Sequence, residues 1–318
     1  MQRFLCVINM ELKGRHLLSL KDFTREEIQL FLDTAADFKR QRYRSELATS
    51  LLGRSVGMVF ERPSTRTRVS FEVAINELSG DPLFLSAQEL QLSRGEPIAD
   101  TARVLSRYVH GIVIRATDHE HVAELAEHST IPVINALTPM YHPCQALADL
   151  LTIHEKLHEL EGLKLAYVGD GNNVCHSLMI SGATMGLEVI VATPSGYEPN
   201  AKVTKLARER AEANMSSVEL THDAKTAASD ADVLYTDVFV SMGQDKERQK
   251  RLEAFLPKFQ INEALLEAAA PHTIVMHCLP AHRDEEITNA VIEGPHSVVW
   301  DQAENRLHTA KAVLALLM

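Results

Sequence analysis

The sequence predicts an α/β protein composed of two doubly wound parallel-sheet domains joined by long helices. Its 318 residues are enough for two domains of ordinary size. Apolar, β-rich runs alternate with helical patterns along almost the whole chain, which predicts parallel sheets with right-handed crossovers. Hydrophobic residues make up 45% of the chain and charged residues 24%, values typical of a protein with a buried core.

The predicted strands are short runs rich in apolar and β-branched residues. They are Ser55–Phe60, Gly111–Ile114, Pro132–Ile134, Lys164–Val168, Glu188–Ala192, Val233–Thr236, Thr273–Met276 and Ser297–Val299. Helical spacing of apolar residues predicts helices at Ile98–Tyr108, Gln145–Leu157, Ala201–Ala213 and Asn305–Leu317.

A long helical pattern at residues 145–161, followed by the strand in "GLKLAYVGD", predicts the passage from one domain to the next. We therefore expect a first domain at residues 1–150 and a second at 151–302. We expect the C-terminal helix, at about 303–318, to pack back on the first domain.

Composition excludes several classes of protein. A net charge of −11 argues against a nucleic-acid partner, because phosphate backbones are bound by clustered Lys and Arg. No apolar run approaches the length of a membrane span, and no signal-peptide core is present. The four cysteines are scattered and predict neither a disulfide framework nor a zinc knuckle: Cys6, Cys144, Cys175 and Cys278. No H-x-x-x-H or H-E-x-x-H spacing on a helix is expected to bind metal. We expect a soluble, cytoplasmic protein that needs no metal.

Polar clusters follow six of the predicted strands. Open α/β sheets bind ligands at the carboxyl ends of their strands, so we expect one composite site there. The clusters are Ser64–Arg68, Arg115, His142–Gln145, Gly169–Asn173, Asp237–Gly243 and His277–Pro280.

The first cluster, in "PSTRTR", predicts an anion site. Ser64 occupies the expected N-cap position of a helix, where backbone N–H groups, hydroxyls and a guanidinium could bind phosphate. An ordinary capped surface helix is the alternative. His142 and Arg115 would be two donors suited to an oxygen that becomes more negative during a reaction.

The later clusters supply different chemistry. Asn173 offers hydrogen bonds, and Asp237 a carboxylate, although such an Asp can also be a local cap. Cys278 is interpreted as a polar ligand and need not be a nucleophile. The Gly169-Asp170-Gly171 turn lacks the third glycine of a dinucleotide fingerprint, because Val174 stands there, so a tight turn is the favoured interpretation.

Together, "STRTR", "HPCQ", "DVFVSMG" and "HCLP" occur in an order that resembles the ornithine carbamoyltransferases of the aspartate/ornithine carbamoyltransferase superfamily. The resemblance begins at about Leu12; the ten residues before it match nothing in the family. Phe239 stands where the family usually has Trp, and we interpret this as a packing substitution. The resemblance implies carbamoyl transfer from carbamoyl phosphate to the δ-amino group of L-ornithine, giving L-citrulline and phosphate. It implies no cofactor, a homotrimer or a multiple of trimers, and a place in arginine biosynthesis.

The resemblance also implies roles for individual residues. Carbamoyl phosphate would contact Ser64, Thr65, Arg66, Thr67, Gln91, Arg115, His142, Gln145, Cys278, Leu279 and Arg306. Ornithine would contact Asn173, Asp237, Ser241 and Met242. The catalytic set would be Arg66, Arg115, His142 and Cys278, and Gln91 would act in the site of a neighbouring subunit.

Three alternatives stay open from the sequence. The chain could be a carbamoyltransferase for putrescine or an N-acylornithine, although "SMG" favours a free amino acid as acceptor. It could be an NAD-linked oxidoreductase built on the Gly169 turn. It could also be a catalytically silent binding protein that keeps the fold.

Overall fold

The computed structural model describes residues 12–241 and 243–318, and the chain divides into two compact units. Unit 1 consists of the chain up to Leu151 together with Asn305–Met318, and unit 2 is Thr152–Glu304. Each unit is built on a parallel sheet with helices around it, which confirms the predicted fold class. The ten N-terminal residues that match nothing in the family pattern lie outside the described residues.

The sheet of unit 1 has the strand order β2-β1-β3-β4, and all its strands are parallel. The strand order reverses between β1 and β3, the two central strands. Both are buried, because the sheet is covered on both faces. The strands are β1 (Ser55–Phe60), β2 (Asp81–Ser86), β3 (Gly111–Arg115) and β4 (Val133–Leu137).

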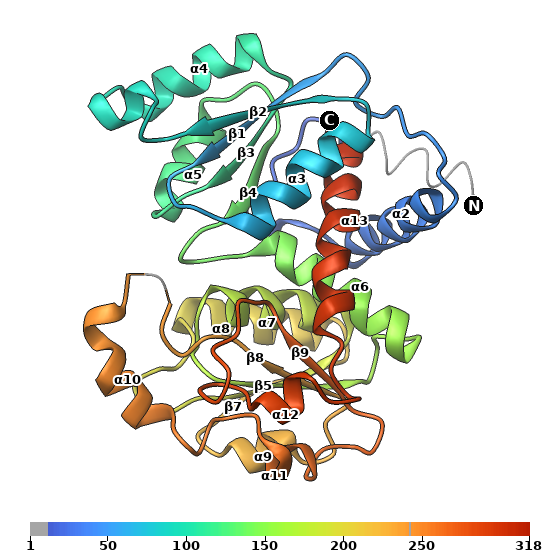
Figure 1. Cartoon of the computed structure of the whole chain (residues 1–318), viewed down its shortest axis with the longest axis vertical. Helices are drawn as coiled ribbons and strands as arrows, with labels where there is room; N and C mark the ends of the chain where they lie inside the picture. The colour runs from blue at the N-terminus through green and yellow to red at the C-terminus, as the bar shows by residue number, and fades with distance from the viewer. Residues whose placement is uncertain (1–11, 242) are drawn as a thin grey trace. The chain divides into compact units, whose positions relative to one another are not determined.

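Helices cover the two faces of this sheet. On one face α4 and α5 pack against apolar residues of β1 and β3, among them Val59 and Ile112. Elsewhere in the unit α3 lies beside α13, and Glu77 pairs with Lys311 between them (Figure 1). The helical segments are η1 (Leu20–Asp22), α2 (Arg25–Tyr43), α3 (Thr65–Glu77), η2 (Gln91–Arg94), α4 (Ile98–Tyr108), α5 (His119–Glu127), α6 (Pro143–Leu157) and α13 (Val299–Leu317). The last two cross the boundary between the units.

The sheet of unit 2 has the order β7-β6-β5-β8-β9, again all parallel, and reverses between β5 and β8. Figure 1 shows α7 and α8 on one face of it and α9 and α11 on the other. Its strands are β5 (Lys164–Val168), β6 (Glu188–Ala192), β7 (Val218–Thr221), β8 (Val233–Thr236) and β9 (Ile274–His277). Its helical segments are α7 (Asn173–Met185), α8 (Ala201–Ala213), α9 (Ala224–Ala228), η3 (Asp245–Glu247), α10 (Arg248–Phe255), α11 (Glu263–Leu266) and α12 (Asn289–Ile292).

Two strands were not predicted, and one predicted strand is wrong. The missed strands, β2 and β7, are edge strands in which half of the residues are exposed; β2 begins with Asp81 and Pro82, and β7 has only four residues, so neither has the pattern of a buried strand. Residues 297–299 form no strand: Ser297 makes one isolated bridge to Val275, and Val299 already begins α13. The helices predicted at Ile98–Tyr108 and Ala201–Ala213 are confirmed.

The most apolar helices belong to the core. Helix α7 buries every residue from Val174 to Met185, yet it has only 13 residues. Among the described residues, no helix combines the length and the apolar character that crossing a bilayer requires.

Candidate functional site

In unit 1 a hydrogen bond crosses the point where the strand order reverses. Arg115 is the last residue of β3, and Ser64 lies in the loop between β1 and α3. Arg115 Nη1 donates to Ser64 Oγ at 3.3 Å. At such a point the connections that follow two adjacent strands run in opposite directions and leave a crevice between them. Open α/β sheets bind their ligands in this crevice.

The N-terminus of α3 is available to an anion. Ser64 has the backbone of an N-cap residue, with φ −158° and ψ 117°, but its side chain makes no capping hydrogen bond. The first helical turn also contains no acidic residue. The first N–H groups and the positive end of the helix dipole therefore receive no negative group from this segment. This favours an anion site over an ordinary capped helix.

Three arginines form the cationic part of this site. Arg306 is buried; its Nη1 donates to Gln145 Oε1 at 2.5 Å and its Nη2 to Thr67 Oγ1 at 3.5 Å. Burial, followed by repulsion from Arg306 and Arg66, lowers the pKa of Arg115 to about 10. Two buried arginines, Arg115 and Arg306, with Arg66 near enough to repel Arg115, favour a bound anion.

His142 and Gln145 complete the site from the start of α6. Both side chains are buried. Burial and then the charges of Arg306 and Arg115 hold the pKa of His142 well below its usual range, so the imidazole is neutral at pH 7. Gln145 Nε2 donates to Asp149 Oδ1 at 2.8 Å, one helical turn along α6. The sequence analysis missed Asp149, although the i,i+4 spacing on a predicted helix was a usable signal.

The "STRTR" segment divides between two environments. Thr65 and Arg66 lie exposed on the first turn of α3, whereas Thr67 is buried against Arg306. Arg68 instead pairs with Glu72 at 3.1 Å, and its guanidinium stacks 3.7 Å from the ring centre of Phe84. Arg68 thus serves the outer surface of α3 and makes a natural control for Arg66.

Gln91 begins the short helix η2 and is exposed. Its predicted action in a neighbouring subunit's site concerns an assembly of several chains, and it stays a prediction.

Unit 2 also has a hydrogen bond across the reversal of its strand order, but here the bond joins an amide and a carboxylate. Asn172 follows β5 and Asp237 follows β8, and Asn172 Nδ2 donates to Asp237 Oδ2 at 2.7 Å across the reversal of strand order. Asp237 Oδ1 accepts from the Cys278 thiol at 2.9 Å and from the Val238 N–H at 2.8 Å. A buried carboxylate that accepts from three donors is held in one orientation. Asp237 is therefore a fixed negative group at the carboxyl end of this sheet.

The other predicted ornithine residues lie on the same segments. Asn173 is the first residue of α7, and its Oδ1 accepts from Val174 N at 3.0 Å. Ser241 N donates to Gln244 Oε1 at 2.9 Å, within the loop after Asp237. Met242 lies outside the described residues. Leu279 follows Cys278 after β9, so these two residues belong to unit 2.

A buried His–Glu pair supports the "HCLP" segment. His277 Nδ1 accepts from Leu279 N at 2.8 Å, so the proton of the neutral ring is on Nε2, which lies 3.0 Å from Glu286 Oε1. Both side chains are fully buried. The pair fixes the backbone that carries Cys278. Sequence analysis missed Glu286, because it lies in a loop without periodicity.

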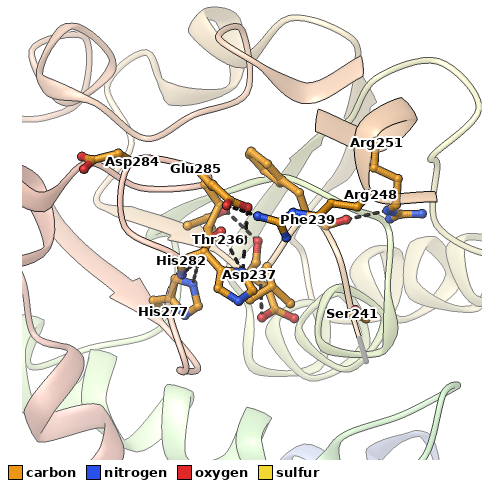
Figure 2. Close-up of polar contacts among 12 residues, drawn as sticks. Thr236, Asp237, Phe239, Ser241, Arg248, Arg251, His277, His282, Asp284 and Glu285 are labelled. Atoms are coloured by element: carbon orange, nitrogen blue, oxygen red, sulfur yellow. Dashed lines mark hydrogen bonds and ion pairs between the residues drawn. The ribbon is translucent and has the colours of Figure 1, made fainter. Parts of the chain in front are cut away.

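A buried ion pair holds the segment after Asp237. Arg251 Nη2 lies 2.5 Å from Asp170 Oδ2, and Arg251 Nε donates to the Phe239 carbonyl at 2.5 Å. Burial outweighs the effect of Arg251 and raises the pKa of Asp170 to about 6. Phe239, whose backbone Figure 2 shows beside Arg251, is fully buried. Its ring stacks on Phe255 with ring centres 4.5 Å apart, which agrees with its interpretation as a packing substitution.

The Gly169 turn is explained by packing. A Cβ on Gly171 would lie 2.3 Å from the backbone nitrogen of Pro199, so the close approach of this neighbouring segment requires glycine. This accounts for Gly171 without a dinucleotide.

The expectation about histidine spacing needs a correction. "HEKLH" at residues 154–158 does have the H-E-x-x-H spacing of helical metal sites. However, α6 ends at Leu157 and His158 has φ +68°, so the two rings do not share a helical face. These histidines do not belong to either cluster of close metal-ligand atoms found among the described residues.

The six predicted clusters therefore gather in two places, three in each unit. One place is cationic and the other contains a carboxylate, a thiol and amides. That all six form a single composite site stays a prediction.

Comparison with known proteins identifies the family. Residues 15–155 match the model described as "Aspartate/ornithine carbamoyltransferase, carbamoyl-P binding domain", and residues 161–317 match "Aspartate/ornithine carbamoyltransferase, Asp/Orn binding domain". The first matched region contains the three polar clusters of unit 1, and the second contains the three polar clusters of unit 2.

Similar whole proteins agree. The chain is 56% identical over 309 residues to "Ornithine carbamoyltransferase, anabolic" of Pyrococcus furiosus, which covers 97% of this chain and 98% of the relative. It is 54% identical to an ornithine carbamoyltransferase of Halalkalibacterium halodurans, covering 97% of each chain. The solved ornithine carbamoyltransferase of Pyrococcus furiosus superposes with a TM-score of 0.94 at 56% identity, over 96% of this chain and 98% of that one. That of Thermus thermophilus gives 0.86 at 44% identity, over 96% and 100%. The chain therefore belongs to the aspartate/ornithine carbamoyltransferase family.

Proposed function

We propose that this chain is an ornithine carbamoyltransferase. In this reaction the neutral δ-amine of L-ornithine attacks the carbonyl carbon of carbamoyl phosphate. A C–N bond forms, the C–O bond to phosphate breaks, and the amine loses a proton, giving L-citrulline and phosphate. The names of the relatives and the match to both family models support this proposal.

The observation that carries the proposal is the arginine cluster around the N-terminus of α3. Carbamoyl phosphate is a compact anion, and its leaving group gains negative charge as the C–O bond breaks. Arg66 and Arg306, with the hydroxyls of Ser64, Thr65 and Thr67 and the first N–H groups of α3, would bind the phosphate. No proton from the protein is needed for a leaving group that is ion-paired in this way.

The carbonyl oxygen of carbamoyl phosphate would accept hydrogen bonds from Arg115 and His142. Charge develops on this oxygen during attack, and donors fixed in advance stabilise it without reorganisation. A neutral His142 donates one N–H and keeps its proton. Gln145 would bind the carbamoyl amide, with Asp149 fixing its orientation. Gln91 would join the site from a neighbouring subunit.

The acceptor would bind in unit 2. Asp237 is a fixed carboxylate suited to a cationic amino group, and Asn173, Ser241 and Met242 would complete the contacts to the amino-acid end of ornithine. Cys278 and Leu279 would lie near the δ-amine and the carbamoyl group. The unit that contains residues 1–150 would thus be the carbamoyl-phosphate domain, and 151–302 the ornithine domain.

Assembly and cellular role follow from the same family. We propose a homotrimer or a multiple of trimers, in the cytoplasm, acting in arginine biosynthesis. The word "anabolic" in the name of the Pyrococcus furiosus relative supports a biosynthetic role.

The direct test measures citrulline and phosphate together, with ornithine, putrescine, N-acetylornithine and aspartate as separate acceptors. We expect both products in equal amounts, and only with ornithine. Product with another acceptor alone would leave the phosphate site in place and overturn the acceptor assignment. Arg66→Ala should strongly reduce turnover, whereas its matched control Arg68→Ala should not, because Arg68 pairs with Glu72 and Phe84. Near-normal turnover by Arg66→Ala would refute the phosphate role.

A further inference from the structure

The loop between β9 and α12 carries a second group of polar side chains, distinct from the residues assigned to the reaction. His282, Glu285 and Glu286 each offer one ligand atom, and these three atoms lie within 4.8 Å of one another. His282 Nδ1 is 4.0 Å from Glu285 Oε2 and 3.9 Å from Glu286 Oε2. Figure 2 shows His282 and Glu285 of this loop close to His277, the last residue of β9.

These three atoms are buried and unsatisfied. His282 Nδ1, Glu285 Oε2 and Glu286 Oε2 have no hydrogen-bond partner in the part of the chain that the structure describes. The Glu286 side chain is 0% exposed, so its Oε2 is an unpartnered carboxylate oxygen in the interior, aimed at the imidazole. Such an oxygen is costly to bury unless a cation or a donor meets it.

The opposite atoms of both carboxylates already have partners. Glu286 Oε1 lies 3.0 Å from His277 Nε2 and accepts from His282 N at 2.5 Å. Glu285 Oε1 pairs with the guanidinium of Arg248. Carboxylates that ligate a metal are commonly oriented in this manner by hydrogen bonds to their second oxygen. The arrangement therefore fixes the two carboxylates and leaves one oxygen of each directed toward His282.

From this geometry we propose that His282 Nδ1, Glu285 Oε2 and Glu286 Oε2 bind a divalent transition-metal ion of the zinc class. His282 Nδ1 lies 4.0 Å from Glu285 Oε2 and 3.9 Å from Glu286 Oε2, so a point midway between Nδ1 and either oxygen lies about 2.0 Å from both atoms. Zinc bonds to nitrogen and carboxylate oxygen are about 2.0–2.2 Å, so the nitrogen and each oxygen are already spaced to share one ion. One imidazole with two carboxylates suits Zn²⁺ or Co²⁺ better than Ca²⁺ or Mg²⁺, which favour all-oxygen sites.

A direct hydrogen bond from a protonated His282 is the competing account. The spacings of 3.9 and 4.0 Å are too long for a hydrogen bond, which requires about 3.2 Å or less. The imidazole is 42% exposed as a whole while its Nδ1 is buried, so the outer edge of the ring faces solvent and the inner nitrogen faces the carboxylates.

The test measures metal binding without any assay of activity, so it is independent of the proposed reaction. Protein treated with chelator and then freed of it is titrated with Co²⁺ and Zn²⁺, by absorption and calorimetry. Asp237, His277 and Cys278 form another cluster of close ligand atoms, so the titration is done in a Cys278→Ser background. Test variants in this background are His282→Ala and Glu285→Gln. The control is His272→Ala, which removes an exposed histidine paired with one carboxylate, Asp232.

We expect one equivalent of Co²⁺ to bind with visible d–d absorption and no thiolate charge-transfer band, and Zn²⁺ to displace it. Mutation of a residue that only hydrogen-bonds to a metal ligand lowers metal affinity by roughly 10- to 100-fold. Loss of a ligand itself, in His282→Ala, should therefore lower the affinity for Co²⁺ and Zn²⁺ by about 100-fold or more. Glu285→Gln should also weaken binding, His272→Ala should not, and Mg²⁺ and Ca²⁺ should not compete. The melting temperature of His282→Ala without metal should equal that of its parent, which establishes that it folds. Unchanged affinity in both test variants, or no stoichiometric binding in the Cys278→Ser background, would overturn the proposal.

Discussion

Replacing Arg115 by Met should make the protein more stable and almost inactive. Arg115 is buried at the end of β3, beside Arg306 and Arg66, and its side chain makes a hydrogen bond of 3.3 Å with Ser64. Met has a similar length and can remain in the buried space without a charge. The substitution therefore removes an electrostatic cost together with the donor that we propose for the carbonyl oxygen.

The magnitude follows from the pKa of Arg115, which is lowered to about 10. For a base, a lowered pKa means that folding disfavours its charged form. The cost is complete at every pH below about 10 and disappears as the pH rises from there past the pKa of an unperturbed arginine. The difference corresponds to about 3 kcal/mol at pH 7. Loss of the Ser64 hydrogen bond offsets about 1 kcal/mol. We therefore expect a net stabilisation of about 2 kcal/mol.

Thermal unfolding with and without phosphate measures this effect. About 2 kcal/mol should raise the melting temperature by roughly 4 to 8 °C for a unit of this size. Added phosphate should stabilise the wild type through binding to the folded state and should stabilise Arg115→Met much less. We expect kcat/KM to fall by about 100- to 1,000-fold, the usual cost of losing one donor to a developing oxyanion.

The matched control is Arg68→Met, which removes an exposed arginine from the same segment and should leave activity and the response to phosphate intact. An Arg115→Met protein that melts below the wild type without phosphate would show that the arginine cluster is not electrostatically strained. An unchanged response to phosphate would show that Arg115 does not contribute to the anion site. Either result would refute the reasoning.

Three further predictions concern other parts of the two units. Asp237→Asn should raise the KM for ornithine at least about tenfold with little effect on the KM for carbamoyl phosphate, because one charge-assisted contact is lost; steady-state kinetics in both substrates would contradict this if both constants rose equally. The ratio of wild-type to His142→Asn kcat/KM should be constant between about pH 6 and 8, since burial keeps His142 neutral there; a ratio that changes with pH would mean that the histidine titrates. Gly171→Ala should lower stability by about 1–3 kcal/mol in denaturant unfolding, because its Cβ meets the Pro199 backbone. Gly182→Ala, whose Cβ meets only the end of the Val189 side chain, should cost less, and equal losses would argue against the close contact.

The sequence predicted the centres of both sheets better than their edges. A strand such as β3 is buried on both faces and reads as a continuous apolar run. The edge strands β2 and β7 have exposed residues, and β2 contains Pro82, which an edge tolerates but which weakens a strand pattern. The run at residues 297–299 was misassigned because three apolar or small residues suit the start of a buried helix equally well.

The site shows a similar limit. Residues at strand ends, such as Arg115 and Asp237, could be predicted because topology alone brings them to one edge of a sheet. Their supporting partners could not: Glu286 reaches His277 from a loop, and Arg251 reaches Asp170 from α10. Such contacts depend on the path of irregular segments, which neither periodicity nor motif spacing encodes.

The two units place polar groups of opposite charge at equivalent positions in their sheets. In each, a hydrogen bond joins residues at the carboxyl ends of the two strands between which the strand order reverses: Arg115 to Ser64 in unit 1, and Asn172 to Asp237 in unit 2. The bond fixes polar groups at the point where the crossovers diverge, so they need little reorganisation when a substrate arrives. The fold determines where these groups lie, and the side chains determine what binds. Arginines and an uncapped helix favour an anion, whereas a buried carboxylate favours an amine, so the proposed assignment of the two substrates rests on the sign of the charge at each reversal of strand order.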